Sequence, residues 1–227
     1  MNTNDLIENL AEGLKPAAPL WRPSRRTAAW AIGAALYLGA LVAMMLAGAA
    51  TATSTDASFW VPQIAAVVTG LVASHAAFAS VVPGLSRRAS VWAVVAAMVW
   101  LATLATSPPW DVDWARVFAA SHEWICVGFV VGGGLPLLLA LAAMLRRGAP
   151  LSPTTTAALA ALAVGALANV GACLSLPHAN NEITLAWHGG VVLALVAVAA
   201  LTGHLVFTWS TARRPSTAES RASKDRR

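Results

Sequence analysis

The chain has 227 residues, of which 58% are hydrophobic and only 11% are charged, and its formal net charge is +5. This composition is typical of a membrane protein and excludes an ordinary soluble globule. A basic excess can also indicate nucleic-acid binding. Here, however, the basic residues are grouped in particular gaps between apolar segments, which favours a topology signal. We therefore expect the lipid bilayer, and not nucleic acid, to be a direct partner.

Residues 1–26 are predicted to form a short cytoplasmic head with one amphipathic helix. Leu6, Leu10 and Leu14 recur at every fourth position, which places them on one helical face. Ile7 lies beside them and widens this apolar stripe. A lone helix of about ten residues is marginal in water. We therefore expect the stripe to lie against a partner protein, the membrane surface or the rest of the chain.

Residues 27–209 are predicted to form an all-α transmembrane domain with six spanning helices. Each apolar segment has about 17 to 25 residues, the length a helix needs to cross a hydrocarbon core of about 30 Å. The segments are 27–49, 60–82, 90–106, 124–145, 156–176 and 185–209. Residues 210–227 are polar and basic and are predicted to be a disordered cytoplasmic tail.

The basic residues predict the orientation of this domain. Fourteen of the 15 Lys and Arg residues lie at the two ends of the chain or in every second gap. They are Lys15, Arg22, Arg25, Arg26, Arg87, Arg88, Arg146, Arg147, Arg213, Arg214, Arg221, Lys224, Arg226 and Arg227. Since cationic loops stay in the cytoplasm, both termini are predicted to be cytoplasmic in a multi-pass protein of the bacterial inner membrane. Trp30 then falls at an inner membrane boundary, where aromatic belts occur.

The fourth segment contains a cluster of helix-weakening residues, Gly132–Gly134 followed by Pro136. Small residues in a spanning helix usually permit close packing against a neighbour. Alternatively, Gly runs and Pro create a point at which the helix deforms. Both readings stay open from the sequence alone.

Catalytic motifs of soluble enzymes are absent from the sequence. It has no phosphate-binding glycine loop followed by Lys, no HExxH pair and no nucleophile elbow. No Asp or Glu lies within a predicted span, which argues against a proton-relay or cation-coupled transporter. We therefore expect a protein that is not an enzyme and needs no cofactor.

Cys126 and Cys173 are the two cysteines, and they lie at the outer ends of the fourth and fifth segments. Counted from the shared inner turn, both lie about 30 Å up their helices. The Cα atoms of facing residues on packed helices would be about 3.5–5.5 Å apart, which overlaps the range of a disulfide. Rotation about each helix axis leaves the pairing open. On the outer side of an inner membrane, such thiols can cycle with a disulfide.

Three histidines, His122, His178 and His188, are predicted to lie at the same level as the cysteines. His122 and Cys126 are four residues apart and would share a helix face. Thiol and imidazole ligands suit a soft or borderline metal ion. Buried cysteines without any such role are the alternative.

Several short motifs follow one another along the chain. They are Asp5-Leu6-Ile7, Leu14-Lys15-Pro16, Val82-Pro83-Gly84, Leu145-Arg146-Arg147-Gly148-Ala149-Pro150-Leu151-Ser152-Pro153 and Trp187-His188. In this order, and with a cysteine at the outer end of segments four and five, they resemble the negative regulators of sigma F (NrsF), a family of six-span bacterial anti-sigma factors. Family members often carry a His directly before the second cysteine, whereas Ala172 stands there in this chain.

The resemblance implies that the chain holds an extracytoplasmic-function sigma factor at its cytoplasmic face. Cys126 and Cys173 would be the pair that senses oxidative or heavy-metal stress and causes release. We expect the apolar stripe of the head to contact the sigma factor through Leu6, Ile7, Leu10 and Leu14. Two other classes stay open, a membrane thiol-disulfide oxidoreductase and a small transporter or assembly factor.

Overall fold

The computed structural model describes residues 2–12, 20–47, 57–82, 88–105, 115, 123–148, 150, 152–175 and 185–207. Every regular element within these residues is a helix, which confirms the all-α class. The elements are α1 (Thr3–Glu12), α2 (Pro23–Leu46), α3 (Ala57–Ala79), α4 (Arg88–Leu104), α6 (Glu123–Gly128), the π-helix η1 (Phe129–Gly133), α7 (Gly134–Arg146), α8 (Pro153–Ser175), the π-helix η2 (Leu185–Gly189) and α10 (Gly190–Val206). The predicted tail at 210–227 lies outside the described residues.

Within the described residues, five helical stretches are long and apolar enough to cross a membrane. They are Pro23–Leu46, Ser58–Ala79, Trp124–Arg146, Pro153–Ser175 and Leu185–Val206. The remaining segment, α4, is apolar but has only 17 residues. The structure therefore fits a multi-pass membrane protein, while the sixth span and the cytoplasmic placement of both termini stay predictions.

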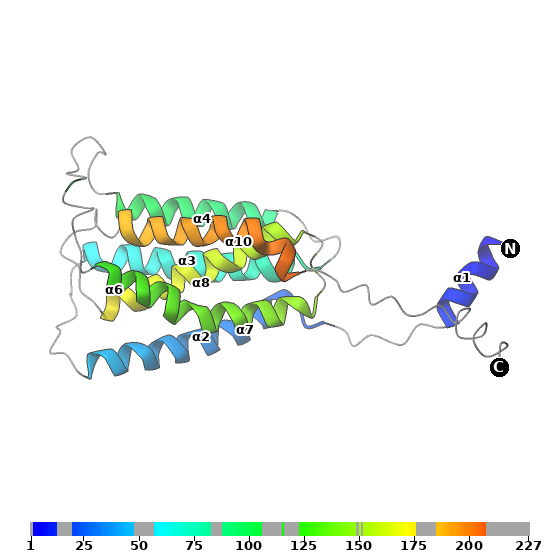
Figure 1. Ribbon diagram of the computed structural model, residues 1–227, viewed down its shortest axis with the longest axis horizontal. Coiled ribbons are helices and arrows are strands. Elements are labelled where there is room, and N and C mark those ends of the chain that lie inside the picture. The colour runs from blue at the N-terminus through cyan, green and yellow to red at the C-terminus, as the bar shows by residue number, and fades with distance from the viewer. Residues whose placement is uncertain are drawn as a thin grey trace, which may run out of the picture.

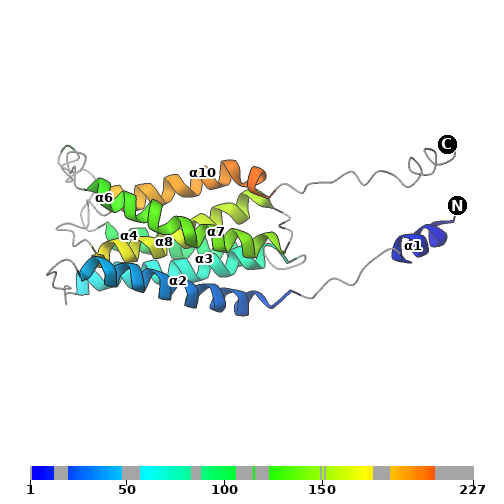
Figure 2. The same ribbon diagram turned by 60° about the horizontal axis from the view of Figure 1, so that its bottom comes forward.

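The spanning helices form an elongated bundle around α8 (Figures 1 and 2). α8 packs against α2, α3, α7 and α10, and 83% of its most apolar 18-residue stretch is buried. Its sequence allows this central position because small residues dominate its surface and let neighbouring backbones approach closely. At Gly203 of α10, for example, an added Cβ would lie 2.7 Å from the Cβ of Ala157.

The two ends of the bundle differ in chemistry. α2, α4 and α8 begin at one end, and α3, α7 and α10 end there (Figure 1). We call this the arginine end, defined by Arg26, Arg88, Arg146 and Arg147. The opposite end is the cysteine end, which is defined by Cys126, Cys173 and His188.

Helix α1 lies apart from the bundle, on the side of the arginine end (Figures 1 and 2). The backbone N–H of Asn2 donates to the Asp5 carboxylate at 3.2 Å, which satisfies one of the free donors at the start of the helix. Ile7 is 60% exposed. The side chains of Leu6 and Leu10 and the whole of Leu14 lie outside what the structure describes, so the predicted stripe stays a prediction.

Arg26 and Trp30 correct two expectations from the sequence. α2 begins at Pro23, inside the predicted head, because proline is well suited to the first helical position. This earlier start places Arg26 on the buried face of α2 together with Trp30, Ala34 and Leu38. Arg26 is therefore not a loop cation, and Trp30, only 4% exposed, packs in the core instead of a boundary belt.

Of the two interpretations of the fourth segment, the structure shows close packing, while a point at which the helix deforms stays a prediction. A Cβ on Gly134 would lie 3.1 Å from Val164 of α8, so this glycine permits close packing. Immediately before it, residues Phe129–Gly133 form the π-helix η1, a local departure from α geometry. Such π-helical turns often occur at functional sites.

Candidate functional site

A buried polar cluster lies at the cysteine end, where α8 meets η2. Asn169 and Cys173 are four residues apart on α8, and both face His188 of η2. His188 Nδ1 lies 2.6 Å from Asn169 Oδ1 and 3.8 Å from Cys173 Sγ, and the Sγ lies 4.0 Å from the same Oδ1. All three side chains are buried: Asn169 and His188 are each 1% exposed, and Cys173 is 4% exposed. We call them the thiol cluster.

The short contact between His188 and Asn169 determines the chemistry of the cluster. An amide oxygen only accepts hydrogen bonds, so Nδ1 carries a proton and donates it to Asn169 Oδ1. Cys173 Sγ lies 3.8 Å from the same Nδ1, so a small turn of the imidazole away from Asn169 would bring the N–H group to the sulfur, where it would stabilise a thiolate. The cluster therefore places an imidazole N–H group beside a nucleophilic atom.

Local backbone structure places His188 in this position. It belongs to the π-helix Leu185–Gly189, whose wider turn changes the rotation of the side chains before α10 begins. Gly189 follows, and a Cβ there would already lie 3.3 Å from Leu101 of α4. The small residue directly after His188 therefore lets the turn lie close to α4.

Cys126 lies on α6 and is also buried, with 3% of its surface exposed. Phe129, three residues further along, packs over Gly171 of α8, where an added Cβ would lie 2.9 Å from the ring. Cys126 and Cys173 thus each lie within about one helical turn of the same contact. Neither cysteine forms a disulfide in the structure, so a redox pairing between them stays a prediction.

The structure describes only some of the predicted metal ligands. His122 and His178 lie outside the described residues. Among the residues that are described, no group of three or more His, Cys, Asp or Glu side chains is arranged to hold a metal ion. Cys173 and His188 nevertheless lie in contact. The sequence predicted only that they lie at the same depth in the membrane.

Asn169 is the functional candidate that our sequence analysis missed. A polar amide in the middle of the apolar stretch 156–176 was a usable signal, because intramembrane polar residues are costly unless they have a role. Its spacing of four residues from Cys173 also predicts a shared helix face.

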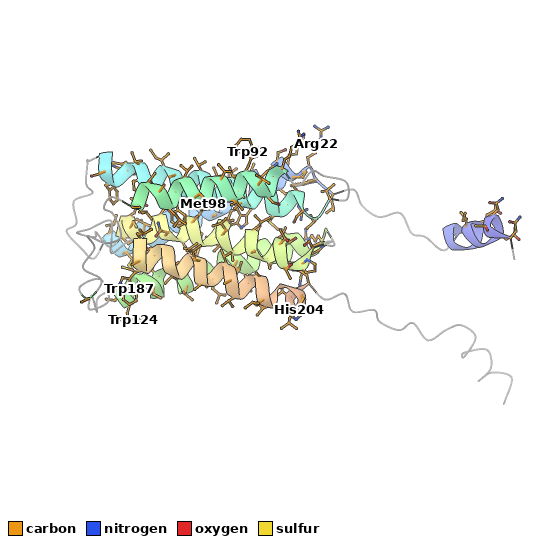
Figure 3. All side chains as sticks on the ribbon, turned by 90° about the horizontal axis from the view of Figure 1, so that it is seen from above. Arg22, Trp92, Met98, Trp124, Trp187 and His204 are labelled. Atoms are coloured by element: carbon orange, nitrogen blue, oxygen red, sulfur yellow. The ribbon has the colours of Figure 1, made fainter. Side chains whose placement is uncertain are left out.

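Two aromatic side chains mark the rim of the cysteine end. The rings of Trp124 on α6 and Trp187 on η2 meet edge to face, with centroids 5.2 Å apart. Figure 3 shows both of them at the end opposite His204. Trp124 is 64% exposed, as expected for a residue at a membrane boundary. The contact joins the helix that carries Cys126 to the π-helix that carries His188.

The arginine end has its own tertiary contacts. Arg146 donates from Nε and Nη2 to the carbonyl oxygen of Val206, at 3.0 and 2.6 Å, and so ties the end of α7 to the end of α10. Arg26 donates from Nη2 to the carbonyl oxygen of Met144, and its guanidinium lies 4.6 Å from the centroid of the Phe78 ring. These two arginines therefore hold helices together.

Comparison with known proteins places the chain in a family. No curated protein and no solved structure matches it. Residues 10–209 match the family described as negative regulator of sigma F, in agreement with the motifs that suggested it. The matched region includes every spanning helix, the thiol cluster and both cysteines. The chain therefore belongs to the NrsF family of negative regulators of sigma F.

Proposed function

We propose that this protein holds an extracytoplasmic-function sigma factor at the cytoplasmic face of the inner membrane and releases it when Cys126 and Cys173, on the outer side, react. Family membership is the observation that carries the anti-sigma role, which is regulatory and not enzymatic. The thiol cluster supports the sensing role, because Cys173 lies beside a histidine donor that an inert core cysteine would not need.

The proposed orientation is supported by the arginine end. Basic residues are retained in the cytoplasm, and Arg88, Arg146 and Arg147 lie together at this end of the bundle. Helix α1, which presents the exposed Ile7, lies on the same side (Figure 1). The cysteine end would then face the oxidising side, where thiols can be converted to disulfides.

The sensing chemistry would begin at Cys173. In the oxidative form, Cys126 and Cys173 lose two protons and two electrons to a thiol oxidant and form a disulfide. In the metal form, a soft cation displaces the thiol proton of Cys173 and binds the sulfur. His188 would join as a second ligand through Nδ1, 3.8 Å from the sulfur, once the ring proton has moved from Nδ1 to Nε2. Both routes change the packing of α8 against its neighbours at the cysteine end.

Three helices could carry this change across the membrane. α8 runs from Cys173 to Pro153 at the arginine end, and η2 with α10 runs from His188 to Val206. Val206 is held by Arg146, so movement of α10 would reach the end of α7 as well. A disulfide typically biases a structure by about 2–4 kcal/mol. Since about 1.4 kcal/mol changes an affinity tenfold, partial coupling would suffice for release.

The test uses the full-length chain in membranes together with its sigma factor. We expect the sigma factor to co-purify with the wild type and to be lost after treatment with a thiol oxidant or a soft metal ion. Cys173→Ser should retain it under both treatments. Cys126→Ser should retain it under oxidant but release it under metal, because the Cys173–His188 pair is intact. His204→Ala, at the opposite end, is the matched control and should behave as wild type.

Normal release from the variant with both Cys126→Ser and Cys173→Ser would refute the sensing role while leaving the anti-sigma role intact. Failure of the wild type to retain any sigma factor would refute the anti-sigma role itself. Labelling of Cys126 or Cys173 by a membrane-impermeant thiol reagent only from the cytoplasmic side would refute the orientation.

A further inference from the structure

An apolar groove runs along the bundle between α7 and α10. Both helices pack against α8, which forms the floor of the groove, with Ala157, Ala160 and Ala161 as its small side chains. Leu139 of α7 and Val198 of α10 belong to opposite walls, and 62% and 57% of their surfaces are exposed. The cavity between them has a volume of about 250 Å³. The groove exists because the floor residues are too small to fill the space between its walls.

Contacts close the two ends of this groove. At the arginine end, Arg146 of α7 donates twice to the carbonyl oxygen of Val206 of α10. At the cysteine end, the rings of Trp124 and Trp187 join α6 to η2, at 5.2 Å between centroids (Figure 3). The walls are therefore held together above and below the cavity. Closure at both ends favours a thin, flexible occupant over a spanning helix, which is about 10 Å across with its side chains.

We propose that this groove binds one acyl chain of an anionic phospholipid. The chemistry of the lining selects a hydrocarbon: among the described lining residues, Thr202 is the one with a polar side chain, and its hydroxyl already donates to the carbonyl oxygen of Val198 at 2.8 Å. All three helices around the groove are candidate membrane spans, so it opens towards lipid chains. A dry apolar cavity of about 150 Å³ can hold benzene. A volume of about 250 Å³ is suitable for a longer segment of a chain.

The charge at the arginine end selects the headgroup. Ala142 lines the groove, and Arg146 follows one helical turn later along α7, with Arg147 next to it. Both arginines are exposed. Within the described part of the bundle, the acidic residue Glu123 lies at the opposite end, so no carboxylate of that part lies beside these guanidinium groups. A phosphate at the mouth of the groove would therefore meet two cations.

Native mass spectrometry of the purified, delipidated full-length chain tests this site. We expect one molecule of phosphatidylglycerol to bind more tightly than phosphatidylcholine with the same acyl chains. Ala161→Leu, which fills the floor, should weaken binding of both lipids by about tenfold, the contribution of roughly two buried methylene groups. Thr202→Phe, on an exposed wall, should do the same without disturbing the core. Arg147→Gln should reduce only the preference for phosphatidylglycerol.

Ala102→Leu, on the exposed face of α4, is the matched control and should bind lipid as the wild type does. Equal lipid binding by the wild type, Ala161→Leu and Thr202→Phe would overturn the proposal. A dimer of the chain that forms without lipid and dissociates in both groove variants would also overturn it, because a second copy would then be the occupant. An equal affinity for the two lipids in the wild type would overturn the choice of headgroup.

Discussion

Gly203 and Gly190 lie on the same helix and have opposite surroundings, which makes them a direct test of how α10 packs. A Cβ added at Gly203 would lie 2.7 Å from both the Ala157 Cβ and the Pro153 carbonyl oxygen of α8. A Cβ added at Gly190 would meet no atom within 4 Å. We therefore consider the substitutions Gly203→Ala and Gly190→Ala as a matched pair.

The expected magnitudes follow from two opposing effects. Replacing a helical glycine by alanine stabilises the helix by roughly 0.5–1 kcal/mol. This gain is common to Gly190 and Gly203 and cancels when the two variants are compared. At Gly203 the clashing atoms are a methyl group and a backbone oxygen, neither of which can rotate away, so overpacking should cost about 1–3 kcal/mol. The free energies of unfolding of the two variants should therefore differ by about 1–3 kcal/mol.

Thermal unfolding of the purified full-length variants in one detergent, at one scan rate, measures this difference. For a chain of this size, each kcal/mol corresponds to about 2–4 °C in Tm. We expect Gly190→Ala to unfold at or above the wild-type temperature and Gly203→Ala to unfold below it. A Gly203→Ala protein as stable as the Gly190→Ala protein would show that α10 does not lie against the start of α8.

Two further predictions concern the thiol and the head. His188→Ala should slow modification of Cys173 by a small thiol reagent by at least about tenfold, because a hydrogen bond to a charged group contributes about 1.5–3 kcal/mol; His204→Ala should not, and peptide mass spectrometry measures both rates. Ile7→Asp should prevent co-purification of the sigma factor but leave the Tm unchanged, because α1 lies apart from the bundle. Asn4→Asp adds the same charge at another exposed position of α1 and should retain the sigma factor.

The positions of the helices were largely readable from the sequence. Apolar length determines where a chain can cross a membrane, and the structural helices agree with the expected segments to within a few residues. The common depth of Cys126 and Cys173 followed from counting at a constant rise per residue, and the Phe129–Gly171 contact agrees with it. Depth depends only on distance along a helix, which spacing supplies directly.

Rotation about the helix axis was not readable in the same way. The contact between Cys173 and His188 depends on the π-turn of η2, which shifts the side-chain register in a manner that an ideal 3.6-residue period does not contain. Arg26 was misplaced for a related reason. Its charge indicated a loop, but α2 begins before it, and packing of α2 places Arg26 on the buried face, where Phe78 and a backbone carbonyl accommodate it.

The central helix α8 connects the cysteine end of the bundle to the arginine end. α8 makes one contact near each of its ends: Cys173 contacts His188, and Pro153 packs against Gly203. His188 and Gly203 in turn belong to one continuous stretch, Leu185–Val206. A change at the thiol cluster therefore acts on two helices, α8 and the stretch Leu185–Val206, that contact each other near both ends. If a modified Cys173 weakens sigma-factor binding, a bound sigma factor must make Cys173 harder to modify by the same free energy.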